Sequence, residues 1–292
     1  MIPNSNDGSK RAPRLRIDIS AGNVWTLPPY SKGPRGSDDE IMAALSAAGY
    51  EGVQGKSIEL CRKHGLAATG GGRVNTPEEA EPIAKQHKEM GYDLATLHVG
   101  WGHEDDATLD RLTSAIIEAA DKHRFPLYME THRATIIQDP FRTVQLVKRF
   151  PALRFNGDFS HWYTGLEMRY GDYEEKLAFI APVLERVRFI HGRIGNSSHM
   201  QIALSDPSAP KAIADFKELW TRSFTGFLKT AQPGDILCFT PELLHPEINY
   251  ARLFLNAKGE WVEESDRWTD ALKMCEIAKE AFAEAQRRVA LK

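Results

Sequence analysis

The chain has 292 residues, of which 42% are hydrophobic and 26% are charged, and its formal net charge is −3. This balance is typical of a folded globular protein. A nucleic-acid partner is not expected, because no basic excess is present to neutralise a phosphate backbone. No apolar run approaches the roughly 18–20 residues that span a bilayer, so no membrane partner is expected either.

Three cysteines, Cys61, Cys238 and Cys275, are widely spaced and form no CxxC pair. This pattern argues against a disulfide framework and predicts a cytoplasmic protein. The first segment, residues 1–14, is polar and lacks the apolar core of a signal peptide. We predict a flexible N-terminal tail there. A single domain over residues 15–292 should follow it, because no linker or repeat divides the rest of the chain.

Short apolar runs alternate with amphipathic segments through this domain, as expected for parallel strands buried on both faces and joined by helices. Helix starts are marked by Ser37 with Glu40, by the segment TPEE at 76–79 and by Asp139 before a proline. A last amphipathic helix begins at about Ser265. The predicted strands, in chain order, are 15–20, 52–55, 66–69, 93–99, 126–130, 153–158, 187–191 and 236–241.

Eight strands with seven mostly helical connections predict one closed (β/α)8 TIM barrel of the α/β class. A doubly wound open sheet is the alternative. It would usually carry a glycine fingerprint after its first strand, but this turn reads SAGNVW, and the glycines at 70–72 are not followed by GK[ST]. The segment 195–210 is long, polar and irregular, and we expect it to cover a substrate.

Polar side chains follow five consecutive predicted strands. Because barrel strands converge at their C-terminal ends, these groups should meet even though Glu130 and Glu242 lie 112 positions apart. In strand order they are His98, then Glu130 and His132, then Asp158 and His161, then His191 and Arg193, and last Glu242.

Four of these residues form a candidate metal site: Glu130, Asp158, His191 and Glu242. Three carboxylates and one imidazole suit Mn²⁺, Mg²⁺ or Co²⁺ and leave positions open for substrate oxygens. We predict one divalent metal ion, with Mn²⁺ first and Mg²⁺, Co²⁺ or Zn²⁺ as alternatives. The sequence contains no HExxH motif, and the donor set does not resemble that of a closed structural zinc site.

The remaining residues near the strand ends are candidates for catalysis or substrate binding. His161 follows Asp158 by three positions and is either a functional group or a hydrogen-bonding partner of the ligand. Arg193 shares a strand face with His191 if the strand continues. Substrate binding is also considered, beside ordinary packing or hydrogen bonding, for His98, His132, Trp101 and Trp162.

The motifs METH, GDFSH, FIHGR and TPE, in this order, resemble the xylose-isomerase-like TIM barrel superfamily. The pattern is similar to the branch with ketose 3-epimerases, hydroxypyruvate isomerase, inosose dehydratase and dehydroshikimate dehydratase, and the resemblance covers about residues 15–291. It implies that His161 binds substrate and that Arg193 contacts substrate oxygens. It also implies metal roles for Glu130, Asp158, His191 and Glu242.

Two departures limit what the resemblance implies. The epimerases carry a further glutamate about six residues after the first ligand, where this chain has Ile136. The related type IV apurinic endonucleases bind three zinc ions with an Asp-x-His pair, and here the corresponding loop has His199 alone. We therefore expect a small-molecule sugar as the substrate and no DNA.

The combined pattern predicts a divalent-metal-dependent sugar isomerase or epimerase that acts on a carbohydrate or polyol carbonyl compound. The metal would stabilise an enediolate while Glu130 or Glu242 removes the proton next to the carbonyl. One alternative is a metal-dependent lyase or dehydratase, which eliminates a group from a keto-sugar or oxidised glycoside and is favoured by Ile136. The other is a non-catalytic barrel that binds a sugar. A homo-oligomer, either a dimer or a tetramer, is also expected.

Overall fold

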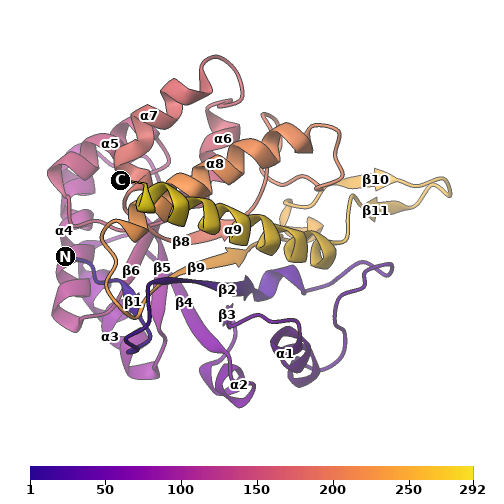
Figure 1. The fold of residues 1–292 in the computed structure, drawn as a ribbon, viewed down its shortest axis with the longest axis horizontal. Helices are drawn as coiled ribbons and strands as arrows, with labels where there is room; N and C mark the ends of the chain where they lie inside the picture. The colour runs from indigo at the N-terminus through magenta and orange to yellow at the C-terminus, as the bar shows by residue number, and fades with distance from the viewer. Residues whose placement is uncertain (292) are drawn as a thin grey trace.

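The computed structural model describes residues 1–291. Eight parallel strands, β2 to β9, pair in chain order, and β9 pairs with both β8 and β2, which closes the barrel. This confirms the predicted single (β/α)8 TIM barrel (Figure 1). The strands are β2 (Arg14–Ser20), β3 (Gly52–Gln54), β4 (Ala67–Val74), β5 (Leu94–Val99), β6 (Leu127–Glu130), β7 (Phe155–Asn156), β8 (Val187–Gly192) and β9 (Asp235–Pro241).

Helices alternate with these strands and cover the outside of the barrel, with α9 lying beside α8 (Figure 1). Short 3-10 turns are η1 (Ala21–Asn23), η2 (Pro77–Glu79) and η3 (Pro246–Ile248). The α-helices are α1 (Asp38–Ala47), α2 (Ile58–Lys63), α3 (Ala80–Met90), α4 (Asp106–His123), α5 (Pro140–Arg149), α6 (Phe159–Gly165), α7 (Tyr173–Leu184), α8 (Ala209–Leu228) and α9 (Arg267–Ala290).

Local sequence signals set several of these boundaries. The Ser37 side chain accepts a hydrogen bond from the Glu40 amide, and the Glu40 side chain accepts one in return, so the predicted capping box opens α1. Asp139 caps α5 ahead of a proline, also as predicted. The last helix begins one residue after its cap, Asp266. Strands β8 and β9 are buried along their whole length, as their continuous apolar runs predicted.

The N-terminal segment packs against the barrel, so the prediction of a flexible tail over 1–14 is wrong. Ile2 is buried, and strand β1 (Ser5–Asn6) pairs antiparallel with β9. The Ser5 amide donates a hydrogen bond to the Tyr128 hydroxyl at 2.9 Å. The segment is polar overall, but it is held by a buried apolar side chain and by pairing with the first residues of β9, which lie before the pairing of β9 with β8 begins.

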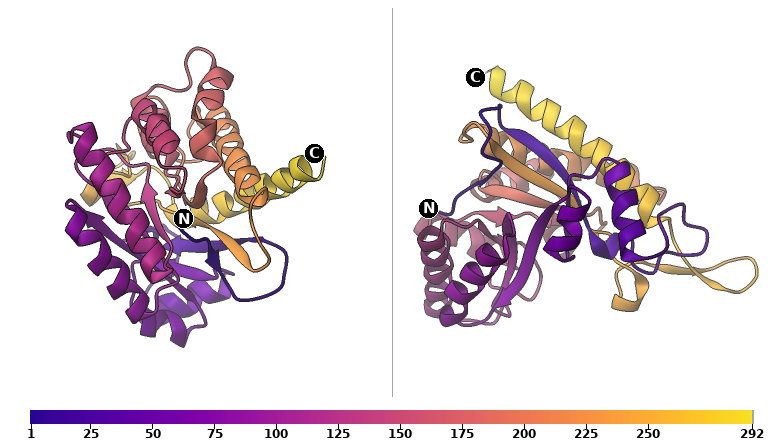
Figure 2. Two further views of the ribbon diagram at one scale, coloured as in Figure 1. Left: turned by 90° about the vertical axis from the view of Figure 1, so that its left-hand side faces the viewer. Right: turned by 90° about the horizontal axis from the view of Figure 1, so that it is seen from below.

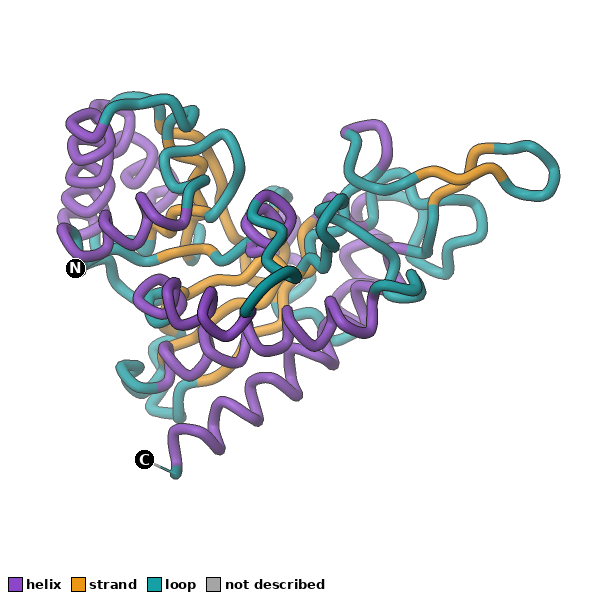
Figure 3. The backbone as a smooth tube through the Cα atoms, turned by 90° about the horizontal axis from the view of Figure 1, so that it is seen from above, coloured by secondary structure: helices purple, strands orange, loops and turns teal. Residues whose placement is uncertain are grey.

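A two-stranded hairpin, β10 (Leu253–Leu255) with β11 (Trp261–Glu263), projects far from the barrel and was not predicted (Figure 3). Two views agree that its tip lies at the end of the molecule opposite the C-terminal end of α9 (Figures 1 and 2). Within residues 1–291, no helix has the length and apolar character needed to cross a membrane.

Candidate metal centre

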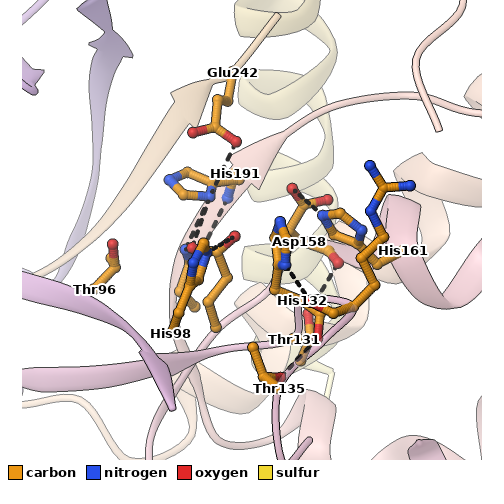
Figure 4. A network of polar contacts seen from close by, with 12 residues as sticks. Thr96, His98, Thr131, His132, Thr135, Asp158, His161, His191 and Glu242 are labelled. Carbon is orange, nitrogen blue, oxygen red and sulfur yellow. Dashed lines mark hydrogen bonds and ion pairs between the residues drawn. The ribbon is translucent and has the colours of Figure 1, made fainter. Parts of the chain in front are cut away.

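Four side chains meet at the C-terminal end of the barrel. Glu130 ends β6, Asp158 caps α6 directly after β7, His191 lies in β8, and Glu242 follows β9. Each offers one ligand atom, and these four atoms all lie within 4.8 Å of one another. Figure 4 shows Asp158, His191 and Glu242 reaching the same region from separate elements. The four side chains therefore lie close together in space, as the barrel topology predicted.

The electrostatics of this set call for a cation. Glu130 and Asp158 are almost fully buried, and Glu242 retains 17% of its side-chain exposure. If all three carboxylates are ionised and His191 is neutral, the one adjacent guanidinium, that of Arg193, leaves a balance of −2. Uncompensated charges of this kind are costly in a protein interior.

The pKa values express the same imbalance. Burial lowers the pKa of His191, but the carboxylates of Glu242 and Glu130 outweigh it and raise that pKa to about 9. Burial raises the pKa of Glu130, yet the neighbouring His191 holds it well below its usual range. A proton on His191 or a divalent cation within the four groups would each offset the negative charge.

Two amides orient the His191 ring, and the sequence analysis identified neither. The side-chain amide of Gln54, at the end of β3, donates to the Thr96 hydroxyl at 2.9 Å. This hydrogen bond directs the Gln54 side-chain oxygen toward His191 Nε2, which lies 2.7 Å away. Nε2 therefore carries the proton, and Nδ1 faces Glu130 at 3.4 Å and Glu242 at 3.5 Å. Asn156 Nδ2 lies 3.0 Å from His191 Nδ1 and also donates to Glu130 Oε2 at 3.1 Å.

Replacing Gln54 with methionine is expected to weaken metal binding by about 10- to 100-fold, the usual cost of losing a group that orients a ligand. Methionine keeps the length of the side chain but removes the acceptor for His191 Nε2. Competition with a chelator measures the affinity, and Gln86→Met, on the exposed face of α3, is the control. An unchanged affinity would show that the ring is held without Gln54.

Arg193 contacts the carboxylates. Its Nη1 lies 3.1 Å from Asp158 Oδ2, its Nη2 pairs with Glu242 Oε2, and its Nε donates to the Glu242 carbonyl at 2.9 Å. The guanidinium also lies 4.4 Å from the ring centre of Tyr250, a second residue that the sequence analysis missed. The side chain is 1% exposed. Its predicted contact with substrate stays a prediction.

Three imidazoles lie in a row beside the carboxylates, with neighbouring rings tilted by 35° and 51° (Figure 4). The ring centres of His98 and His132 are 4.2 Å apart, and those of His132 and His161 are 3.9 Å apart. His98 Nε2 lies 3.4 Å from Glu130 and His161 Nε2 lies 3.5 Å from Asp158. Both ends of this row of rings therefore contact candidate metal ligands. Burial, and then the neighbouring His161, lower the pKa of His132 to about 3.

These histidines differ in their free hydrogen-bonding capacity. Both ring nitrogens of His161 are buried without a hydrogen-bond partner among the described residues. The ring of His132, by contrast, contacts the Arg133 carbonyl at 2.5 Å and the Tyr250 hydroxyl at 3.4 Å. His98, Glu130 and His132 also bring one ligand atom each within 4.8 Å of one another, so Glu130 belongs to two candidate groups.

The two predicted tryptophans have different positions. Trp162 is buried, and its indole donates to the Ile137 carbonyl at 3.1 Å, so the prediction that it binds substrate is wrong. Successive helical residues point about 100° apart, and α6 therefore turns His161 to the site and Trp162 to the core. Trp101 is 51% exposed beneath the guanidinium of Arg73, and its role stays a prediction.

A cavity of about 840 Å³ opens beside the centre, along the ends of β2, β3 and β4. Its wall includes Gln54, Glu242 and Trp25. The predicted covering segment is indeed a loop between β8 and α8, although several of its residues, including Ile202, are buried.

No family model and no curated protein matches the sequence. A xylose isomerase-like TIM barrel protein from Mycobacterium smegmatis, solved in complex with magnesium, is similar in structure with a TM-score of 0.53 and 12% identity, over 91% of this chain and 97% of that chain. The probable 3-DHS dehydratase AsbF from Bacillus anthracis gives 0.51 and 14%, over 80% and 94%. The chain therefore has the fold of the xylose isomerase-like TIM barrel proteins.

Proposed function

We propose that this protein is a divalent-metal-dependent enzyme that isomerises or epimerises a sugar or related polyol carbonyl compound. The observation that carries the proposal is the convergence of three carboxylates and one imidazole within 4.8 Å, at the catalytic end of a barrel and beside a cavity. Glu130, Asp158, His191 and Glu242 would hold the cation.

The donor set fits such a cation. Asp158 Oδ2 is fully buried with Arg193 Nη1 3.1 Å away, but no donor among the described residues meets it with hydrogen-bond geometry, so it can also accept a metal ion. Oxygen donors with one imidazole suit Mn²⁺ or Mg²⁺. The Mycobacterium smegmatis neighbour with magnesium supports the same chemistry. A bound divalent ion would act as a Lewis acid toward a substrate carbonyl.

Glu242 is the best-placed proton acceptor. It lines the cavity, whereas Glu130 is 4% exposed and its two oxygens already face Asn156 and His98. In the proposed reaction Glu242 takes the proton from the carbon next to the carbonyl. Return of the proton to the neighbouring carbon gives isomerisation, and return to the same carbon from the other face gives epimerisation.

A lyase or dehydratase is the second candidate, because two features favour it. Ile136, at the position where the epimerases carry a further glutamate, is buried and apolar. His161, with both ring nitrogens unpartnered, lies where it could protonate a leaving oxygen. The Bacillus anthracis neighbour is described as a dehydratase, which is consistent with this second reaction.

Turnover in deuterated water tests the proposal. The Mn²⁺-loaded protein is incubated with a panel of keto-sugars, and mass spectrometry follows deuterium uptake and product mass. Uptake with unchanged carbon connectivity is expected for an isomerase or epimerase, while loss of a leaving group identifies the lyase. Sugar binding without exchange would overturn both and favour a non-catalytic barrel.

A further inference from the structure

Arg73 belongs to β4, a strand that contributes residues to the cavity wall. It is near the C-terminal end of β4, on the strand face that it shares with Thr69 and Gly71. Both of those residues line the cavity, and Gly71 is exposed. Arg73 therefore lies one pleat beyond the cavity wall, on the same face of β4.

The guanidinium of Arg73 is held by neutral partners. Its Nη1 donates to the Gly100 carbonyl at 2.5 Å and approaches the Ala134 carbonyl at 3.4 Å. Its Nη2 lies 3.4 Å from His98 Nδ1, and its central carbon lies 4.0 Å from the ring centre of Trp101. These contacts fix the position of the charge without neutralising it.

Two other basic side chains in this region are paired with carboxylates. Arg193 lies against two carboxylates, and Lys56 on the cavity wall pairs with Asp38 at 2.6 Å. The carboxylate of Glu104, on the same loop as Trp101, accepts hydrogen bonds from backbone amides instead. Within residues 1–291, Arg73 forms no ion pair with a carboxylate.

We infer that the substrate carries an anionic group, a carboxylate or a phosphate, and that Arg73 binds it while the reacting carbons lie at the candidate metal centre. The part of this inference that places the reacting carbons at the candidate metal centre rests on the proposed function. A planar guanidinium matches the geometry of both anions, and its fixed orientation reduces the entropy that binding must overcome. One imidazole ring, that of His98, separates Arg73 from Glu130, so the anionic group lies a short distance from the reacting carbons.

The test uses the Mg²⁺-loaded protein and two small anions, inorganic phosphate and acetate. These anions probe the site without knowledge of the sugar that the protein binds. The indole N–H signal of Trp101, the ring beneath Arg73, reports binding by NMR. A saturable shift is expected with at least one anion, and the anion that produces it identifies the chemical source. The shift should vanish in Arg73→Gln, weaken in Arg73→Lys and persist in the control Arg111→Gln, an exposed arginine on α4.

A matched sugar series provides the second arm. D-fructose, D-fructuronate and D-fructose 6-phosphate differ at one carbon, and calorimetry should give roughly 10- to 100-fold tighter binding for an anionic member. That preference should disappear in Arg73→Gln. No saturable shift with either anion, or a shift that persists in Arg73→Gln, overturns the inference. Because neither arm requires turnover, an Arg73-dependent shift without deuterium exchange would reject the proposed function and leave the anion site standing.

Discussion

Glu242→Gln is expected to lower solvent deuterium exchange by at least about 10³-fold while the barrel stays folded. Glutamine keeps the volume of the side chain and one oxygen but removes the basic carboxylate, and a positioned general base alone contributes about 10²- to 10⁴-fold. Loss of a charged ligand adds to this effect. The change also leaves Arg193 with one fewer anionic partner.

Exchange rates by mass spectrometry and folding by circular dichroism measure this prediction together. Glu89→Gln, an exposed glutamate on α3, is the matched control and should exchange at the wild-type rate. Unchanged exchange in Glu242→Gln would assign the base to another group, with Glu130 the first to examine. A variant that is folded, binds metal and is inactive would separate the role of Glu242 as a base from its role as a ligand.

The strands of the barrel could be predicted because their signals are local. Parallel strands buried on both faces produce continuous apolar runs, and β9 is an example that is buried at every position. Strand β7 is harder to bound, because the predicted 153–158 contains only two residues in strand pairing. The N-terminal tail was mispredicted because a polar composition does not reveal that Ile2 is buried or that Ser5 and Asn6 pair with the start of β9.

The four candidate metal ligands were found for a different reason. Each is a chemically distinctive residue that follows a predicted strand, and barrel topology brings such positions together. Gln54 was missed because its partner, His191, lies 137 positions away and an amide has no distinctive metal chemistry. Trp162 was misplaced because the sequence does not show that a helix begins at Asp158 and rotates the indole into the core.

Asp158→Asn is expected to remove metal from the protein without unfolding it. Asparagine caps a helix about as well as aspartate, so the start of α6 should survive. The substitution removes the negative charge of the side chain, so a divalent ion loses one of its three carboxylate ligands. Elemental mass spectrometry should find about one divalent ion per wild-type chain and far less in the variant. Asp105→Asn, which changes the cap of α4 away from the centre, is the control.

The same pair of variants separates metal binding from stability. A ligand at 100 times its dissociation constant stabilises a fold by about 2.7 kcal/mol, so Mn²⁺ should raise the unfolding midpoint of the wild type and of Asp105→Asn but not of Asp158→Asn. Two ions per chain would indicate that His98 and His132 share Glu130 with a second cation. Equal metal content in all three proteins would contradict the assignment, because an ion held partly by Asp158 should be lost with the charge of that carboxylate.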